Sequence, residues 1–208
     1  MARLVQVIGG PLVGMEPEIT PELVLHAYRC GAFPMADESG EIHWYSPDPR
    51  CIFPLDRFHV PRSVRQLIRR EVFELRLDTA FDEVIAACAD RPEGTWISDE
   101  IIAIYRQLHR RRFAHSVECW QGDTLAGGLY GVALGGAFFG ESMFTRVTNA
   151  SKVALVRLVE HLRQRGFVLL DTQWSTPHLR IFGAVEIPRR EYLRRLREAL
   201  ALPCRFSD

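Results

Sequence analysis

The sequence has no apolar run of the roughly 18 residues that a membrane-spanning helix needs. Its apolar N-terminal stretch, Leu4 to Gly14, is interrupted by Gln6 and by Gly9-Gly10-Pro11. Only Arg3 precedes that stretch and no small-residue cleavage pattern follows, so it is a poor signal peptide. We therefore expect a soluble, cytoplasmic protein with no membrane partner. With 47% hydrophobic and 25% charged residues among 208, the composition suits a globular core and excludes a disordered, collagen-like or coiled-coil chain.

Cysteine and histidine are too scattered for a metal site or a disulfide framework. The five cysteines are odd in number and form no C-x-x-C pair, and the seven histidines show no ligand spacing. No Walker sequence is present, and no G-x-G-x-x-G follows a predicted strand, which argues against ATP and dinucleotides. A serine nucleophile elbow is also absent. The sequence thus predicts reduced thiols, no metal and no cofactor.

Lysine is nearly absent, because 25 of the 26 basic residues are arginine and Lys152 is the exception. One interpretation is a coding bias toward arginine, and the other is phosphate binding by planar guanidinium groups. The net charge is zero, yet residues 1–61 carry four bases against eight acids and residues 62–208 carry 22 bases against 18 acids. Such a split indicates two parts with different partners.

Residues 1–61 predict a small N-terminal α+β domain. Thr20-Pro21 begins a helix, because threonine is a good cap and proline suits the first turn, and Gly31 ends it. Prolines on both sides of Asp48 exclude a helix there and predict a turn. We place the boundary with the second domain near Pro61.

Residues 62–208 alternate between strand and helix patterns. The predicted elements are a helix from Pro61 to Arg70, a strand at Phe73–Leu77, a helix from Ala80 to Cys88, a Ser98-capped helix from Asp99 to Arg112, strands at His115–Gln121, Thr124–Val132 and Ala137–Phe144, a helix from Asn149 to Arg165, strands at Phe167–Thr172 and Ala184–Ile187, with a short helix between them at Thr176-Pro177, and a last helix from Pro188. Antiparallel strands followed by a helix and an apolar strand are typical of an α/β domain with a mixed sheet.

Three polar side chains stand in or at the end of apolar strands. Glu141 either faces solvent or pairs with an arginine, or it is buried, where a carboxylate costs free energy and usually has a task. Asp171 and Gln173 end a core strand, and strand alternation points them to the same side. There they would face a ligand crevice of an open α/β sheet, unless Asp171 merely caps a strand-end turn.

Arginines cluster on three predicted helices. The clusters are Arg62, Arg65, Arg69 and Arg70, then Arg110-Arg111-Arg112, then Arg189, Arg190, Arg194 and Arg195. Each cluster alone is typical of a solvated helix face, but gathered on one surface they would bind phosphates in a salt-dependent way. Trp44 and Trp96 belong either to the core or to base-stacking platforms.

Nine short segments, in order along nearly the whole chain, resemble the bacterial leucyl/phenylalanyl-tRNA–protein transferases. The segments are Gly31–Met35, Trp44–Arg50, Gly94–Ile97, Ala114–Glu118, Gly127–Val132, Gly140–Phe144, Asn149–Lys152, Asp171–Gln173 and Gly183–Arg189. Each segment alone is weak, but nine in order at sensible spacing are highly specific.

The resemblance implies transfer of Leu or Phe, and Met less well, from aminoacyl-tRNA to the α-amine of proteins that begin with Arg or Lys, which marks them for the N-degron pathway. It also implies a GNAT-like mixed-sheet domain over residues 62–208. The pyrophosphate loop of GNAT acetyltransferases should precede the long helix, where this sequence has Thr145–Ala150 instead. This departure disfavours acetyl-CoA and fits a donor carried on RNA.

The resemblance further assigns catalytic residues. Gln173 would position or polarise the attacking amine, and Asp171 would orient it. Glu141 would hold the amino group of the aminoacyl ester or the terminal ribose. Since glutamine is no base, positioning is favoured over a proton relay.

The same resemblance implies the binding residues. The apolar aminoacyl pocket would comprise Leu129, Phe138, Met143, Leu158 and Leu170. Trp44 and Trp96 would bind the terminal adenosine or the tRNA end, and Arg62, Arg65 and Arg70 would contact the acceptor-stem backbone. Strict alternation places Phe138 and Met143 on opposite faces, so either the strand bulges or one assignment is wrong.

Two other functions are open at this point. One is a small-molecule GNAT acetyltransferase that uses acetyl-CoA, which a CoA titration would detect. The other is a non-catalytic adaptor that binds RNA or a peptide, and such a protein would keep its function in the Gln173→Ala and Asp171→Ala variants.

Overall fold

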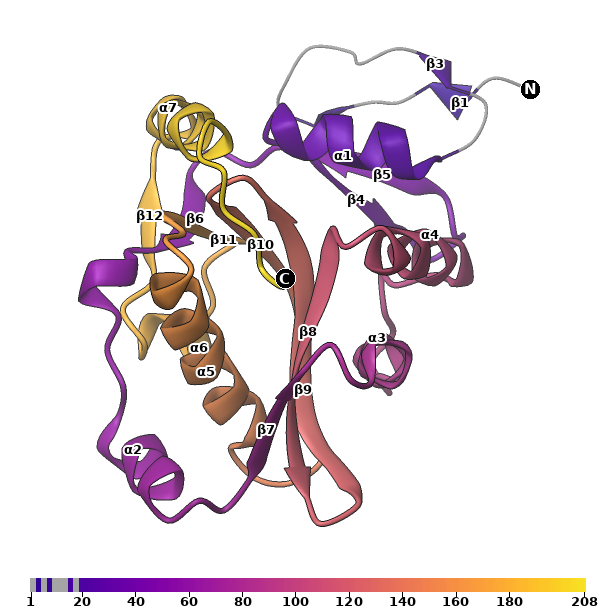
Figure 1. Cartoon of the computed structure of the whole chain (residues 1–208). Coiled ribbons are helices and arrows are strands. Elements are labelled where there is room, and N and C mark those ends of the chain that lie inside the picture. The colour runs from indigo at the N-terminus through magenta and orange to yellow at the C-terminus, as the bar shows by residue number, and fades with distance from the viewer. Residues whose placement is uncertain (1–2, 5–6, 9–14, 17–18) are drawn as a thin grey trace.

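The computed structural model describes residues 3–4, 7–8, 15–16 and 19–208, and a seven-stranded mixed sheet forms its centre (Figure 1). The strand order is β12-β6-β11-β10-β9-β8-β7. β10 and β11 are parallel, and every other neighbouring pair is antiparallel. The strands are β6 Arg50–Phe53, β7 Glu74–Leu77, β8 Ala114–Gln121, β9 Thr124–Leu134, β10 Ala137–Thr145, β11 Leu169–Gln173 and β12 Val185–Ile187.

Helices cover both faces of this sheet (Figure 1). α2 and α5 pack on one face, and α1, α3 and α4 pack on the other, so each face has its own hydrophobic core. The helices are α1 Pro21–Arg29, α2 Arg62–Arg69, α3 Phe81–Ala89, α4 Asp99–Arg110, α5 Ala150–Gln164, α6 Pro177–Arg180 and α7 Arg189–Leu200, with a 3₁₀ turn at Leu55–Arg57. The predicted α/β class with a mixed sheet is confirmed.

The N-terminal region adds two small sheets. β2 (Val7–Ile8), β5 (Ile42–Tyr45) and β4 (Phe33–Ala36) form one, and β1 (Arg3–Leu4) pairs with β3 (Met15–Glu16) in the other. Of the apolar stretch considered as a signal peptide, residues 5–6 and 9–14 lie outside the described residues.

The predicted domain boundary near Pro61 does not separate the large sheet from the chain that precedes it. β6 precedes Pro61, yet it pairs with β11 on one side and β12 on the other. The predicted division into residues 1–61 and 62–208 therefore stays a prediction, with the first part contributing one strand to the central sheet.

The predicted helix caps are present. The Thr20 hydroxyl accepts a hydrogen bond from the Leu23 amide at 3.2 Å, and the Ser98 hydroxyl accepts one from the Ile101 amide at 3.3 Å. These bonds satisfy amides that have no partner inside the first helical turn. α5 begins one residue later than predicted, since Asn149 has a left-handed φ of 68°.

β10 bulges at Glu141. Gly140 pairs with Gly131 and Ser142 pairs with Tyr130, so Glu141 has no partner on β9. A bulge reverses the alternation that follows it, and Phe138 and Met143 therefore belong to the same hydrophobic core, beneath α5. Of the two alternatives drawn from the sequence, the bulging strand is confirmed.

Gly127 on β9 allows α5 to approach the sheet. A Cβ atom there would lie 2.7 Å from the Cβ of Ala150, at the first residue of α5. Any larger residue would push the start of the helix away from the strands, and this packing fixes one wall of the cavity described below.

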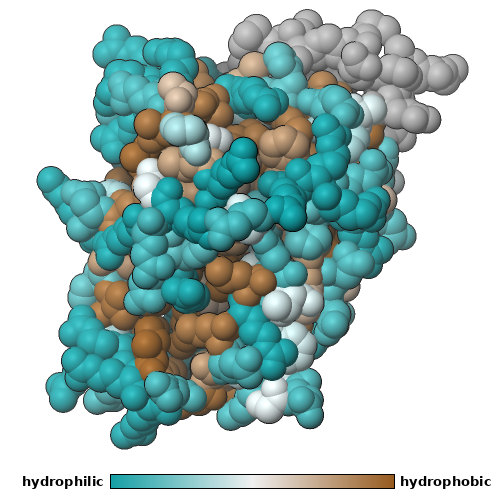
Figure 2. Space-filling model, viewed as in Figure 1, coloured by the Kyte–Doolittle hydropathy of each residue, from teal (hydrophilic) through white to brown (hydrophobic). Residues whose placement is uncertain are grey.

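Most of the surface seen in the view of Figure 1 is hydrophilic, with hydrophobic side chains exposed between α2 and β7 (Figure 2). Half-buried Leu67 and Ile68 of α2 and Leu75 of β7 pack against the core beneath α5. These contacts hold α2 with its apolar side inward, which directs Arg62, Arg65 and Arg69 to solvent.

Candidate active site

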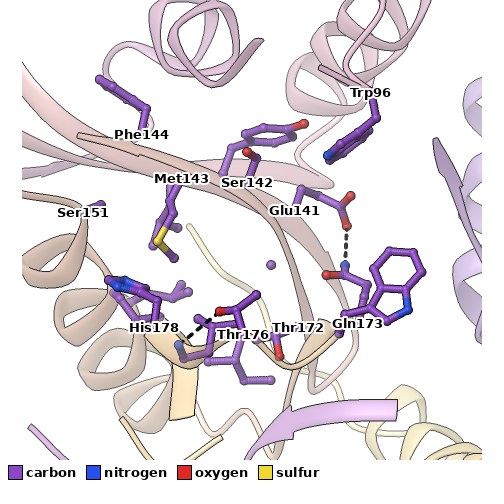
Figure 3. Close-up of a pocket in the computed structure, with 18 of the residues that line it drawn as sticks. Trp96, Glu141, Ser142, Met143, Phe144, Ser151, Thr172, Gln173, Thr176 and His178 are labelled. Atoms are coloured by element: carbon purple, nitrogen blue, oxygen red, sulfur yellow. Dashed lines mark hydrogen bonds between the residues drawn. The ribbon is translucent and has the colours of Figure 1, made fainter. Parts of the chain in front are cut away.

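A cavity opens where the parallel strands β10 and β11 separate. Their pairing ends at Phe139 and Asp171, after which β10 continues along β9 and β11 continues along β6. The gap has a volume of about 520 Å³. It lies at the carboxyl ends of parallel strands, which is where open α/β sheets bind ligands (Figure 3).

One side of the cavity is apolar. Four of the five predicted pocket residues line it, namely Leu129, Met143, Leu158 and Leu170. Leu155 of α5 and Leu179 of α6 also line it and were missed, because their helical spacing has no signal beyond ordinary core packing.

Two predicted binding residues do not reach the cavity. Phe138 is fully buried, and its ring packs against Phe206 with the centroids 5.4 Å apart. Trp44 is 3% exposed and belongs to the core on the opposite side of the sheet from α5. Their predicted contacts with the aminoacyl group and the terminal adenosine are corrected accordingly, since neither residue is among those that line the cavity.

Glu141 and Gln173 point toward each other at one side of the cavity (Figure 3). The Gln173 side-chain amide donates a hydrogen bond to Glu141 Oε1 at 3.2 Å. Each residue sits at an irregularity: Glu141 is the bulge of β10, and Gln173 has a left-handed φ of 59° beside a register shift of β11. Non-glycine residues in that conformation are strained and occur at functional sites.

Burial raises the pKa of Glu141 from its usual 4.5 to about 8, and the negative charge of Asp171 adds to the effect. Hydrogen bonds from Tyr28 and Tyr105 act in the opposite direction. The Tyr105 hydroxyl lies 3.3 Å from Glu141 Oε2 and 2.5 Å from the Tyr28 hydroxyl. A cation that enters the cavity would stabilise the ionised carboxylate and bring this pKa down again.

The raised pKa of Glu141 makes stability depend on pH. Between pH 4.5 and about 8 the folded protein keeps a proton that the unfolded chain has released, so the free energy of unfolding falls as the pH rises through this range. We expect the difference in stability between the wild type and Glu141→Gln to change by a few kcal/mol between pH 5 and 9, in favour of the variant at high pH. Urea unfolding at several pH values measures it, and parallel pH curves for the two proteins would contradict the assignment.

Asp171 lies behind Gln173 rather than in the cavity. Its carboxylate is fully buried and forms two hydrogen bonds with Arg50, Nε to Oδ1 at 2.9 Å and Nη2 to Oδ2 at 2.6 Å. The Tyr192 hydroxyl donates to Oδ2 at 2.9 Å, and the Gln173 backbone amide donates to Oδ1 at 3.0 Å. Asp171 and Gln173 both lie close to Glu141, because the charge of Asp171 raises the pKa of Glu141 and the Gln173 amide donates to its carboxylate, but of the two only Gln173 lines the cavity.

Arg50 was missed as a site residue. It is 0% exposed, and its guanidinium also donates to the Gly31 carbonyl at 3.0 Å and lies over the rings of Phe33 and Tyr192. A single arginine after a proline-rich turn gives no spacing signal, and its partner is 121 positions away. Arg50 neutralises Asp171 and ties β6 to β11.

The remaining predicted tRNA-binding residues lie in two places. Trp96 lines the cavity (Figure 3). Arg62, Arg65 and Arg70 are exposed on or just after α2, outside the cavity lining, and Arg65 donates to the Val60 carbonyl at 3.1 Å.

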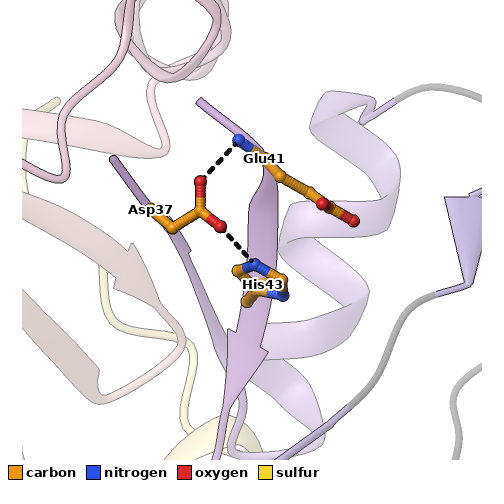
Figure 4. Close-up of side chains that lie close together, drawn as sticks. All are labelled: Asp37, Glu41 and His43. Atoms are coloured by element: carbon orange, nitrogen blue, oxygen red, sulfur yellow. Dashed lines mark hydrogen bonds and ion pairs between the residues drawn. The ribbon is translucent and has the colours of Figure 1, made fainter. Parts of the chain in front are cut away.

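Within the described ranges, one group of side chains lies close enough to share a metal ion, namely Asp37, Glu41 and His43 (Figure 4). Asp37 Oδ1 accepts hydrogen bonds from the Ser39 amide and hydroxyl and from the Glu41 amide. Asp37 Oδ2 lies 2.9 Å from His43 Nε2. Hydrogen bonds from Ser39 and His43 lower the pKa of Asp37. Because Asp37 binds groups on both sides of the turn between β4 and β5, we assign the three residues a role in holding that turn and no metal.

Two family models match the chain. One describes leucyl/phenylalanyl-tRNA protein transferases and matches residues 52–197, and the other describes their N-terminal domain and matches residues 17–48. Along the chain, the first match ends at residue 48 and the second begins at residue 52, so both of these positions precede the boundary that we placed near Pro61. With the cavity and its polar pair, they define the protein as an enzyme of the aminoacyltransferase class.

Close relatives carry the same family name. The leucyl/phenylalanyl-tRNA–protein transferase of Gloeobacter violaceus is 60% identical over 189 residues, which cover 90% of this chain and 97% of that protein. The one from Akkermansia muciniphila is 58% identical over 190 residues, covering 89% and 98%. The chain belongs to the leucyl/phenylalanyl-tRNA protein transferase family.

Among solved structures, L-PGS from Bacillus licheniformis aligns with 64% of this chain and 49% of its own, at 11% identity and a TM-score of 0.43. That likeness carries no argument, so the GNAT-like character of the sheet stays a prediction. Among the described residues, no helix has both the length and the apolar character to cross a bilayer.

Proposed function

We propose that the protein transfers Leu or Phe, and Met less well, from aminoacyl-tRNA to the N-terminal α-amine of proteins that begin with Arg or Lys. The observation that carries the proposal is the cavity between β10 and β11, whose apolar wall lies beside Glu141 and Gln173. An amino-acid side chain would occupy the apolar end, and its ester carbonyl would then lie near the polar end. The further consequence is entry of the product into the N-degron pathway of the cytoplasm.

The reaction needs little chemistry from the protein. The acceptor nitrogen attacks the ester carbonyl carbon, a C–N bond forms, the bond to the ribose oxygen breaks, and the amine proton passes to that oxygen. Since an N-terminal amine has a pKa of about 8, part of it is already neutral at cellular pH. The enzyme must align the two substrates and stabilise the tetrahedral oxyanion.

Gln173 and Glu141 are the groups that contact substrate in this proposal. The Gln173 amide positions the attacking amine, and the Glu141 carboxylate holds the amino group of the aminoacyl ester or the terminal ribose. Asp171 is a positioning residue, because it is enclosed by Arg50 and Tyr192 and acts through the Gln173 backbone. Arg50 occupies both oxygens of the Asp171 carboxylate.

The apolar wall accounts for acceptance of several side chains. One methylene in such a pocket changes specificity by about 1–3 kcal/mol. We expect Leu158→Ala, which enlarges the pocket, to raise the ratio of kcat/KM for Phe-tRNA over Leu-tRNA about tenfold. The ratio is measured within one preparation, so a general loss of stability cancels. An unchanged ratio would remove Leu158 from the pocket.

The arginines of α2 would contact the tRNA backbone. We expect Arg65→Ala to raise KM for Leu-tRNA and to reduce the slope of log KM against log salt by about 1, while sparing transfer from leucyl-adenosine. Arg197→Ala on α7, at the opposite end of the molecule in Figure 1, is the matched control. An equal loss with both donors would show that Arg65 has no phosphate role.

The proposal is tested by incubating the enzyme with radiolabelled Leu-tRNA and a peptide that begins with Arg. Label should enter this peptide and one that begins with Lys, and it should not enter an acetyl-Arg control, whose amine is blocked. Transfer of acetyl groups from acetyl-CoA, or no transfer of Leu to any peptide, would overturn the proposal.

A further inference from the structure

Arg91 lies at the rim of the cavity, in the loop after α3. Among the described residues that line the cavity, it is the one with a permanent positive charge. Its Nη2 donates to the Ser142 hydroxyl at 2.9 Å and to the Met143 carbonyl at 3.1 Å, and its Nε donates to the Cys88 carbonyl at 3.1 Å. The guanidinium is therefore held in place by hydrogen bonds to uncharged groups.

The two hydrogens on Arg91 Nη1 are not used in these bonds. A guanidinium has five N–H donors, and three of them are engaged here. Arg91 is exposed, and within the described part of the chain it forms no ion pair with an acid. A fixed, unneutralised cation with free donors is suited to an anion that accepts more than one hydrogen bond.

A second hollow of about 270 Å³ adjoins the cavity at this point. Four residues line both spaces, namely Arg91, Met143, Phe144 and Thr145. The exposed Arg146 lines the hollow but not the cavity. The Arg146 guanidinium lies over the Phe144 ring, 5.3 Å from its centroid. Asp90 also lines the hollow, so two cationic groups there face one acid.

We infer that Arg91, assisted by Arg146, binds the 5′-phosphate of the nucleotide that carries the aminoacyl ester. The inference rests on the proposed function, because that nucleotide is the donor. When the amino-acid side chain occupies the apolar end of the cavity, the ester leads to the ribose, and the phosphate lies one ribose further out. The adjoining hollow supplies both arginines, and through Arg91, which contacts Ser142 beside Glu141, it borders the cavity.

The test compares two minimal donors that differ by one phosphate, leucyl-adenosine and leucyl-adenosine 5′-phosphate. In the wild type we expect the phosphate to raise kcat/KM about tenfold, the gain of one charge-assisted hydrogen-bonded contact. Arg91→Gln should abolish this gain, so that the variant uses the two donors with equal kcat/KM. Arg146→Gln should reduce the gain in part, Arg91→Lys should retain part of it, and Arg197→Gln is the matched control.

Each other outcome overturns the inference in a distinct way. If Arg91→Gln lowers transfer from both donors equally, Arg91 only holds β10 in place. If the wild type gains nothing from the phosphate, or the variant keeps the gain, the phosphate binds elsewhere while the proposed function stands. If the wild type transfers Leu from neither donor nor from tRNA, the proposed function fails, and this inference fails with it.

Discussion

Arg50→Met is expected to lower the free energy of unfolding by about 3–5 kcal/mol, because it leaves the buried Asp171 carboxylate without its countercharge. Methionine keeps much of the side-chain volume, so the loss reports the charge rather than a cavity. Chemical denaturation measures it. Arg194→Met, which removes an exposed arginine that pairs with Glu191 and Glu198, should have a much smaller effect and is the matched control.

A second variant separates the ion pair from general disruption. Arg50→Met combined with Asp171→Asn removes both charges, and we expect it to be more stable than Arg50→Met alone. We expect the double variant to have lost activity, because the Gln173 backbone amide no longer has the Asp171 carboxylate as its acceptor. If Arg50→Met costs no more than Arg194→Met, the buried pair is not what holds β6 against β11.

Gln173→Ala is expected to lower kcat for transfer from Leu-tRNA about 100-fold or more, with KM for the tRNA little changed. Loss of the group that positions the attacking amine has an effect of about that size. The variant removes the amide beside Glu141 but leaves the apolar wall and the exposed arginines in place. Single-turnover measurements at saturating enzyme separate this effect from tRNA binding.

Gln121→Ala, at the exposed hairpin between β8 and β9, is the matched control and should leave kcat unchanged. A Gln173→Ala enzyme whose kcat lies within twofold of the wild type would exclude Gln173 from the reaction. A rise in KM with kcat preserved would assign it to substrate binding alone.

Local patterns were sufficient to predict most of the fold. Apolar alternation and glycine turns predicted β8, β9 and β10, and capping residues predicted the starts of α1 and α4. The position of β6 could not be predicted, since pairing with β11 and β12 depends on contacts far along the chain. Strand order is a property of the assembled sheet.

The sequence identified which residues form the candidate site better than it predicted where their side chains point. Glu141 was found because a carboxylate in an apolar strand is costly unless it has a partner or a task, and Gln173 was found because it ends a core strand. Alternation alone does not locate the bulge at Glu141 or the left-handed residue at Gln173. The depth of Trp44 and Phe138 is likewise set by packing, which a resemblance in sequence does not report.

The most direct test is a crystal structure of the enzyme with 3′-leucylamino-3′-deoxyadenosine, in which a stable amide replaces the reactive ester. We predict that the leucyl side chain lies against Leu129, Met143 and Leu158, with its carbonyl group beside Gln173 and its amino group within about 3 Å of the Glu141 carboxylate. A leucyl group bound outside the gap between β10 and β11, or one whose carbonyl points away from Gln173, would contradict the account.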